Sequence, residues 1–398
     1  MLPLGPLRRR DFRFLYAAQA VSFFGTMITF VAVPYQMYRL THSSLSVGLL
    51  GLAELLALLT TVFVGGALAD SADRRRMAIG TDMALSLGSA SLMAIAFAGV
   101  TRPWMLYVLA AWMAGIGGLQ RPSMDALVPR LVDKDEMPAA ASLAMFRGSL
   151  GMIGGPAIAG VILATSGVGA AYLTDFVSYV VSFVCLWQIR PVPPLEQSEA
   201  PSLKGVVEGF RYAASRQELI GTYVVDFVAM IFGMPMALFP AMADQLGGPS
   251  ALGWLYGAPA IGALLISLSN KWFAPVQRHG LGVLIAAGVW GLAIVAFGFS
   301  NALWLSVVCL ALAGGADAVS AMYRMTMWNQ TIPDALRGRL ASIEIVSYTS
   351  GPMLGHVEAG LAAAAIGLRG SVISGGVLCV VGVLLCAWRL PKFVSYRA

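Results

Sequence analysis

Charged residues are scarce in this sequence. Only 12% of its 398 residues are Asp, Glu, Lys or Arg, while 58% are hydrophobic, whereas soluble domains have roughly 25% charged and 45–50% apolar residues. This composition excludes a water-soluble globular protein. The apolar residues gather in stretches of about twenty, each long enough to cross a hydrocarbon layer roughly 30 Å thick. The sequence therefore predicts an all-α integral membrane protein.

Cysteine and histidine are also rare, with four and three copies. The cysteines lie inside apolar stretches, and no pair has the spacing of metal ligands, which excludes a disulfide framework and a zinc site. The sequence contains neither HExxH nor the phosphate-binding GxxxxGK[ST] motif. Little chain remains outside the apolar stretches to build a catalytic domain. We therefore expect no enzyme activity, no cofactor and no metal.

Twelve transmembrane helices are expected, in two sets of six. The expected spans are residues 14–38, 45–69, 77–99, 103–122, 138–164, 168–189, 218–243, 251–273, 281–299, 302–322, 340–365 and 370–390. These predict an N-terminal six-helix bundle (1–189), a polar, proline-containing cytoplasmic linker (190–217) and a C-terminal six-helix bundle (218–398). Apolar residues at helical spacing in the linker indicate an amphipathic helix along the inner leaflet, with a solvated tether as the alternative.

The basic residues recur at every second loop rather than forming one patch, so the net charge of +6 does not indicate a nucleic-acid partner. Placing the N-terminus in the cytoplasm leaves only Arg39, Arg102 and Arg369 outside, with Arg147 inside a span. Because Lys and Arg concentrate on the cytoplasmic side of membrane proteins, both termini are expected in the cytoplasm.

The two halves repeat one another. Shifting the sequence by 200 positions aligns Gly151 with Gly351 and Gly155 with Gly355, among other matches. Such an internal repeat indicates duplicated structural units. Repeated six-span halves are typical of secondary transporters, in which one half tilts against the other around a site near mid-membrane. We expect two pseudo-symmetric bundles.

Residues 66–76, GALADSADRRR, resemble the GxLaDrxGrk loop of the major facilitator superfamily, with Ser71 and Asp73 as departures from the family pattern. Gly66 permits close helix packing, and Asp70 can lie against the N-terminus of a neighbouring helix. The resemblance implies a cytoplasmic gate between this loop and the start of the eleventh span, with a purely topological basic loop as the alternative. The expected gate residues are Gly66, Asp70, Arg74, Arg75, Asp125, Arg337, Arg339 and Glu344.

Two further segments carry the resemblance. Gly151, Gly155, Pro156 and Gly160 in the fifth span resemble the family's antiporter motif GxxxGPxxGG, which implies export; generic small-residue packing is the equal alternative. Residues 333–339, PDALRGR, resemble a loop of the branch that contains enterobactin exporters and macrolide-type efflux pumps. Membership of this branch implies a monomer in the bacterial inner membrane, with the proton gradient as driving force.

Several polar groups fall inside the expected spans, where a charge costs about 2.5 to 3.5 kcal/mol and therefore needs a partner, a proton or a function. Glu54 lies near the middle of the second span and is the first candidate for proton coupling. Arg147 and Asp175 lie at similar depth and are expected to form an ion pair, whose role is either structural or in substrate contact. The other candidates for proton coupling or substrate contact are Gln19, Thr26, Asp226, Asp317, Tyr348 and Glu358.

The preferred function is proton-coupled export of a small amphipathic molecule by alternating access, with siderophores first. A multidrug or macrolide efflux pump and a lipid or lysophospholipid transporter are alternatives of the same fold. A membrane receptor that no longer moves its ligand is an alternative of a different class, but it would not need several buried acids and a gate.

Overall fold

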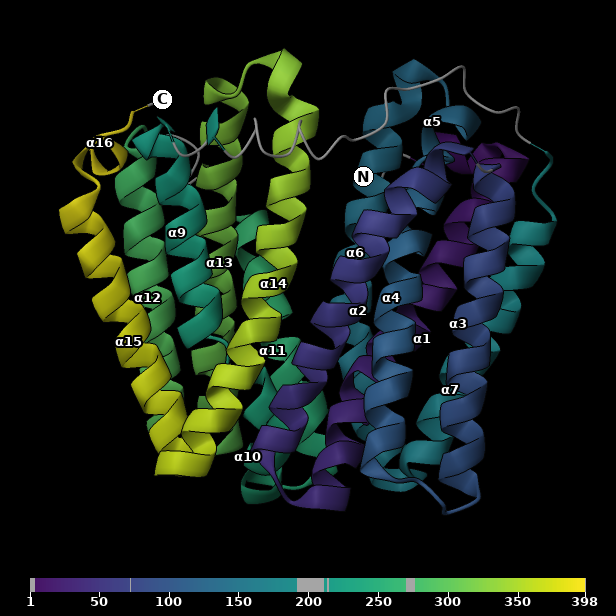
Figure 1. Cartoon of the computed structure of the whole chain (residues 1–398), viewed down its shortest axis with the longest axis horizontal. Helices are drawn as coiled ribbons and strands as arrows, with labels where there is room; N and C mark the ends of the chain where they lie inside the picture. The colour runs from purple at the N-terminus through teal and green to yellow at the C-terminus, as the bar shows by residue number, and fades with distance from the viewer. Residues whose placement is uncertain (1–3, 72, 192–210, 213–214, 270–275, 398) are drawn as a thin grey trace. The chain divides into compact units, whose positions relative to one another are not determined.

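The computed structural model describes residues 4–71, 73–191, 211–212, 215–269 and 276–397, without the side chains of 62–71 and 334–347. The described residues form helices and no strand (Figure 1). The chain divides into two compact units. Unit 1 comprises residues 1–41, 53–200 and 252–257, and unit 2 comprises 42–52, 201–251 and 258–398. The expected amphipathic helix of the linker falls mostly on 192–210, outside the described residues.

Residues 4–71 and 73–191, the described part of the first half, contain six long helices and three short ones. The long helices are α1 (Arg10–Thr41), α2 (Ser44–Ser71), α3 (Arg74–Phe97), α4 (Pro103–Asp125), α6 (Met137–Thr165) and α7 (Gly167–Trp187). The short ones are η1 (Gly5–Arg8), α5 (Val128–Leu131) and η2 (Lys134–Glu136). In unit 1, α7 packs against both α1 and α3, and α6 packs against α1.

The second half contains α9 (Gln217–Phe232), η3 (Pro235–Leu238), α10 (Phe239–Leu246), α11 (Pro249–Leu268), α12 (His279–Phe299), α13 (Leu303–Thr331), α14 (Asp334–Ile366), α15 (Leu368–Arg389) and α16 (Pro391–Val394). In unit 2, α12 packs between α13 and α15, and α9 packs against α14 (Figure 1).

Every expected span coincides with helical structure. Among the described residues, ten helices are long and apolar enough to cross a membrane. The other two expected spans fall on α4 and α14. A glycine with a positive φ lies at the start of the last long helix of each half. Gly167 is the first residue of α7 and Gly367 directly precedes α15, and their φ values of 79° and 83° are ones that glycine adopts without strain. This match agrees with the sequence repeat.

Two expected spans differ from the structure. The seventh is broken, because α9 ends at Phe232 and a short 3₁₀ helix, η3, precedes α10. Pro235 has no backbone N–H to continue the helix, and Trp290 Nε1 instead donates to the carbonyl of Gly233 at 2.9 Å. The tenth span, expected to end at residue 322, continues to Thr331 in α13. This extension places Arg324 inside a helix rather than in a loop.

Candidate functional site

An ion cluster of three side chains joins α9 and α13 in unit 2. Arg324 forms an ion pair with Asp226 on α9, and its Nη2 lies 3.6 Å from Asp317 Oδ1 on its own helix. The side chains of Arg324 and Asp226 are only 11% and 13% exposed, while that of Asp317 is 39% exposed. One guanidinium is thus shared between two carboxylates, of which Asp226 is the closer and better shielded.

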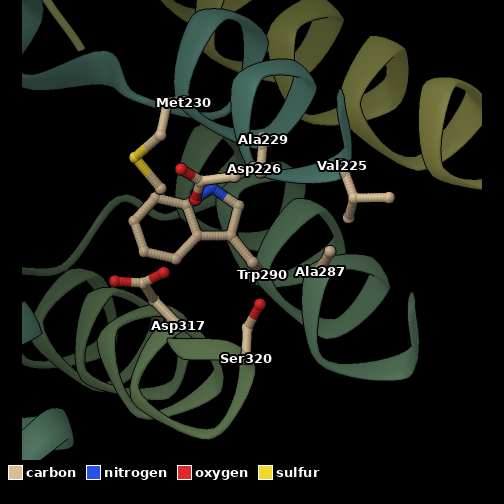
Figure 2. A pocket seen from close by; sticks show the side chains of 8 residues that line it. All are labelled: Val225, Asp226, Ala229, Met230, Ala287, Trp290, Asp317 and Ser320. Atoms are coloured by element: carbon tan, nitrogen blue, oxygen red, sulfur yellow. The ribbon is translucent and has the colours of Figure 1, made fainter. Parts of the chain in front are cut away.

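The two carboxylates line a small pocket between α9, α12 and α13. Figure 2 shows the carboxyl groups of Asp226 and Asp317 beside the indole ring of Trp290. The lining residues are Val225, Asp226, Ala229, Met230, Ala287, Trp290, Asp317 and Ser320. Trp290 Nε1 also donates to the carbonyl of Gly233, so a residue that lines this pocket is hydrogen-bonded to the break that follows α9.

A second pocket, of about 470 Å³ and partly open to solvent, is also lined by Asp226. Its lining residues are Thr222, Tyr223, Asp226, Ala321, Arg324, Met325, Trp328 and Tyr348. The ring centroids of Tyr223 and Trp328 lie 5.2 Å apart, and Trp328 Nε1 donates to Thr222 Oγ1 at 2.8 Å. The pocket therefore combines a cation with fixed aromatic surfaces.

Arg324 is the main residue of this site that the sequence reading missed. The apolar run of the tenth span ends at residue 322, so the sequence predicts Arg324 in the loop that follows. The spacing between Asp317 and Arg324 would have predicted their pairing, because residues seven apart lie on one face of a helix. The candidates Asp226, Asp317 and Tyr348 do line the two pockets, although the Tyr348 side chain is 63% exposed.

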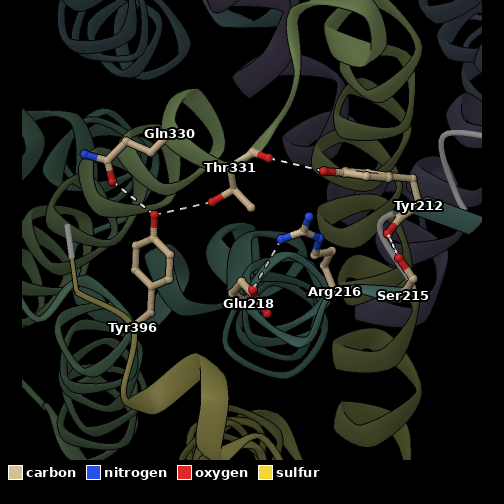
Figure 3. Close-up of polar contacts among 7 residues, drawn as sticks. All are labelled: Tyr212, Ser215, Arg216, Glu218, Gln330, Thr331 and Tyr396. Carbon is tan, nitrogen blue, oxygen red and sulfur yellow. Dashed lines mark hydrogen bonds and ion pairs between the residues drawn. The ribbon is translucent and has the colours of Figure 1, made fainter.

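The end of α13 is held on two sides (Figure 3). Tyr212 Oη donates to the carbonyl of Thr331 at 3.3 Å, and Thr331 Oγ1 lies 3.3 Å from Tyr396 Oη. Tyr396 Oη also donates to Gln330 Oε1 at 3.0 Å. These bonds fix the last turn of the helix that carries Arg324.

The structure does not bring Arg147 and Asp175 together. Arg147 donates to Gln19 on α1, because its position on α6 faces α1 rather than α7. Asp175 accepts hydrogen bonds from Thr29 Oγ1 at 2.7 Å and Ser89 Oγ at 2.5 Å. Arg147 and Asp175 therefore do not form the expected ion pair. Arg147 bonds to Gln19 instead, and Asp175 bonds to two hydroxyl groups.

Three other candidates inside the expected spans have different surroundings. Thr26 Oγ1 lies 2.9 Å from Tyr179 Oη on α7. Glu54 on α2 and Glu358 on α14 are partly buried, and within the described part of the chain neither forms a hydrogen bond or an ion pair. These two acids thus keep the unpaired character that the sequence suggested.

The expected gate is described only in part. The side chains of Gly66, Asp70, Arg337, Arg339 and Glu344 lie outside the described residues.

Three of the expected gate residues have described side chains. Arg75 Nη2 donates to the carbonyl of Trp187 at 2.9 Å, Arg74 begins α3, and Asp125 is the exposed last residue of α4. Asp73, a departure from the family pattern, caps α3 by accepting the N–H of Arg75 at 2.9 Å. Such a cap stabilises a helix by about 1 kcal/mol, which explains an aspartate where the family has glycine.

The glycines of the antiporter motif form the contact between α6 and α1. A Cβ on Gly151 would lie 2.3 Å from the ring of Phe23, and one on Gly155 would lie 2.3 Å from Met27 Cβ. Pro156 and Gly160 are buried on the same helix. In unit 2, a Cβ on Gly355 would lie 2.4 Å from the carbonyl oxygen of Met230 on α9. Both halves thus use matched glycines for close helix packing.

Comparison with known proteins agrees with this architecture. The chain is 29% identical to the enterobactin exporter EntS of Shigella boydii serotype 18 and to that of Escherichia coli O157:H7, over 94% of this chain and 90% of each relative. Three solved structures share the fold: the nucleoside transporter NupG (12% identity, TM-score 0.74, 96% of this chain and 98% of that one), a bacterial homologue of the iron transporter ferroportin (16%, 0.73, 98% and 99%) and a bacterial homologue of the lysosomal transporter Spinster (14%, 0.76, 98% and 98%).

These structural likenesses show the fold alone, and that fold is the expected one of major facilitator transporters. The relatives are transporters rather than enzymes. A family model described as "Transmembrane secretion effector" matches residues 1–397. The chain is therefore a multi-pass membrane protein that belongs to the transmembrane secretion effector family of the major facilitator superfamily.

Proposed function

We propose that this protein exports small amphipathic molecules, siderophores first, across the bacterial inner membrane, with both termini in the cytoplasm and the proton gradient as driving force. The likeness to enterobactin exporters over nearly the whole chain supports the substrate class. The buried ion cluster of unit 2 supports the coupling, and this cluster is the observation on which the proposal chiefly depends.

The charges of the cluster do not balance. Two carboxylates and one guanidinium carry one net negative charge when all three are ionised. Inside a membrane this excess is costly, and one proton removes it. Asp317 is the proton acceptor in this scheme, because it is the more exposed acid and lies farther from Arg324 than Asp226 does. Loading and unloading of Asp317 would then change how strongly Arg324 is held.

The second pocket supplies the substrate contacts. Tyr223, Trp328 and Tyr348 offer aromatic surfaces, and Arg324 offers a cation that reaches the same space. Flat aromatic groups stack on such rings, and anionic oxygens pair with a guanidinium. A siderophore with anionic aromatic groups would compete with Asp317 for Arg324. Substrate and proton would thus act on one side chain, as an antiporter requires.

Everted membrane vesicles with an acidified lumen test this proposal. Adding enterobactin should release protons from the lumen, read with a pH-gradient dye, when the wild-type protein is present. Asp317→Asn should abolish the response, while Asp244→Asn, which changes an exposed acid of α10, should leave it intact. A wild-type response to hydrophobic drugs and none to enterobactin would replace siderophores by the multidrug alternative, and an unchanged response in Asp317→Asn would overturn the coupling role.

A further inference from the structure

Helices α3 and α7 of unit 1 share a crossed arrangement of acids and hydroxyls. Asp82 and Ser89 lie seven residues apart on α3, and Asp175 and Ser182 lie seven apart on α7. Because the helices pack antiparallel, Ser182 Oγ donates to Asp82 Oδ1 at 3.0 Å, and Ser89 Oγ donates to Asp175 Oδ2 at 2.5 Å. Each helix thus provides the acid for one pair and the hydroxyl for the other.

A third helix completes each pair. Thr29 Oγ1 of α1 donates to Asp175 Oδ2 at 2.7 Å, and Gln120 Nε2 of α4 donates to Asp82 Oδ1 at 2.9 Å. Both donors of each acid therefore reach the same carboxyl oxygen. The other oxygens, Asp175 Oδ1 and Asp82 Oδ2, are buried and have no hydrogen-bond partner.

In the part of the chain that the structure describes, no cation balances these acids. Asp82 and Asp175 are both 0% exposed, and among the described residues neither forms an ion pair with Lys, Arg or His. The titratable groups that face them are Tyr172, Tyr179 and Cys185, which supply no positive charge. An isolated carboxylate in such surroundings is very costly, whereas the neutral acid is far less so.

The free oxygen of Asp175 also has no room for an ion on the side of α1. A Cβ placed on Gly25 would lie 2.6 Å from Asp175 Oδ1 and 2.0 Å from Ser178 Oγ. The acid is thus packed directly against the α1 backbone. On this side the backbone of α1 leaves no space for a sodium ion, whereas a proton on the oxygen needs none.

We propose that Asp82 and Asp175 each hold a proton, which makes the α3–α7 seam of unit 1 a binding site for two protons. The proton occupies the carboxyl oxygen that lacks a donor, and the crossed hydroxyls hold the other oxygen. Releasing either proton would leave an unbalanced charge in the packed seam, so release requires water to enter between α3 and α7. This inference concerns proton binding in the resting protein and does not depend on the proposed export.

Infrared spectroscopy of the purified protein in lipid nanodiscs tests the inference, since a protonated carboxyl group has a carbonyl stretch that a carboxylate lacks. With ¹³C-carboxyl-labelled aspartate, the wild-type protein at neutral pH should show an isotope-shifted acid band. Asp82→Asn and Asp175→Asn should each remove part of the band, and the double variant should remove both contributions. The control Asp244→Asn, at an exposed position, should leave the band unchanged.

The wild-type spectrum alone keeps the proposal falsifiable where a variant does not fold. Absence of a shifted band in the wild-type protein would overturn it, as would a full band in the folded double variant. Sodium chloride titrated at constant pH should not alter the band; its loss on adding sodium would show a cation site instead. No substrate is present in these measurements, so their failure is distinct from a failure of the vesicle experiment.

Discussion

Asp317 and Arg324 lie seven residues apart on α13, on one face of the helix, with 3.6 Å between carboxylate and guanidinium. Arg324 also pairs with Asp226 across to α9. The guanidinium therefore links two helices and two acids, and its removal has consequences for both stability and transport.

Replacing Arg324 by Gln should destabilise the protein strongly. Asp226 would remain buried at 13% exposure without its partner, and breaking a buried pair from one side costs about 3–5 kcal/mol. Thermal unfolding of the detergent-purified protein measures the loss. The double variant Asp226→Asn/Arg324→Gln should recover much of it.

The matched control for this change is Arg216→Gln. Arg216 is 49% exposed and lies 3.9 Å from Glu218 (Figure 3), and such surface pairs contribute roughly 0–1 kcal/mol. Equal destabilisation by the two variants would show that burial of the cluster is not what makes Arg324 important.

Gly25→Ala should destabilise unit 1, because the new methyl group would lie 2.0 Å from Ser178 Oγ and 2.6 Å from Asp175 Oδ1. Forcing a methyl group into a packed core costs about 1–3 kcal/mol. Gly80→Ala on α3 is the control, since a Cβ there meets nothing within 4 Å and alanine favours a helix by about 1 kcal/mol over glycine. The two unfolding temperatures should move in opposite directions.

Glu54→Gln should abolish proton-driven efflux while leaving membrane insertion and unfolding temperature unchanged. Glu54 lies within α2 and forms no hydrogen bond or ion pair with a described residue. The substitution therefore breaks no such pair, but it removes a group that can exchange a proton. Efflux at the wild-type rate in vesicles would eliminate Glu54 as a coupling residue.

Asp70→Asn should slow turnover without changing substrate affinity, because the gate loop resembles one that holds a closed state rather than one that binds substrate. Transport rate and equilibrium binding, measured on the same preparation, separate the two effects. An unaltered rate would argue against the gate.

Hydropathy depends only on local composition, so the sequence predicts the spans. The internal repeat and the resemblance to the major facilitator superfamily then predict the fold. Hydropathy does not predict Arg324 inside the span, because the apolar run stops before this arginine, although the helix continues to Thr331. Gly233 and Pro235 favour a break after α9, but averaging hydropathy over a long window does not detect it.

The contacts between helices were not readable in the same way. Arg147 and Asp175 lie in neighbouring spans, with Asp175 buried and Arg147 half-buried. A similar depth in the membrane does not determine which way a side chain points around its helix. Likewise, the pairing of Asp82 with Ser182 depends on the antiparallel register of α3 and α7, which one sequence does not encode in any local pattern.

The indole of Trp290 satisfies the carbonyl of Gly233 that a continuous helix would have used internally. The break between α9 and α10 is consequently a hinge at residues 233–234. A rotation of α10 relative to α9 would change only a few backbone torsion angles there. Bending an unbroken helix would instead break several of its backbone hydrogen bonds.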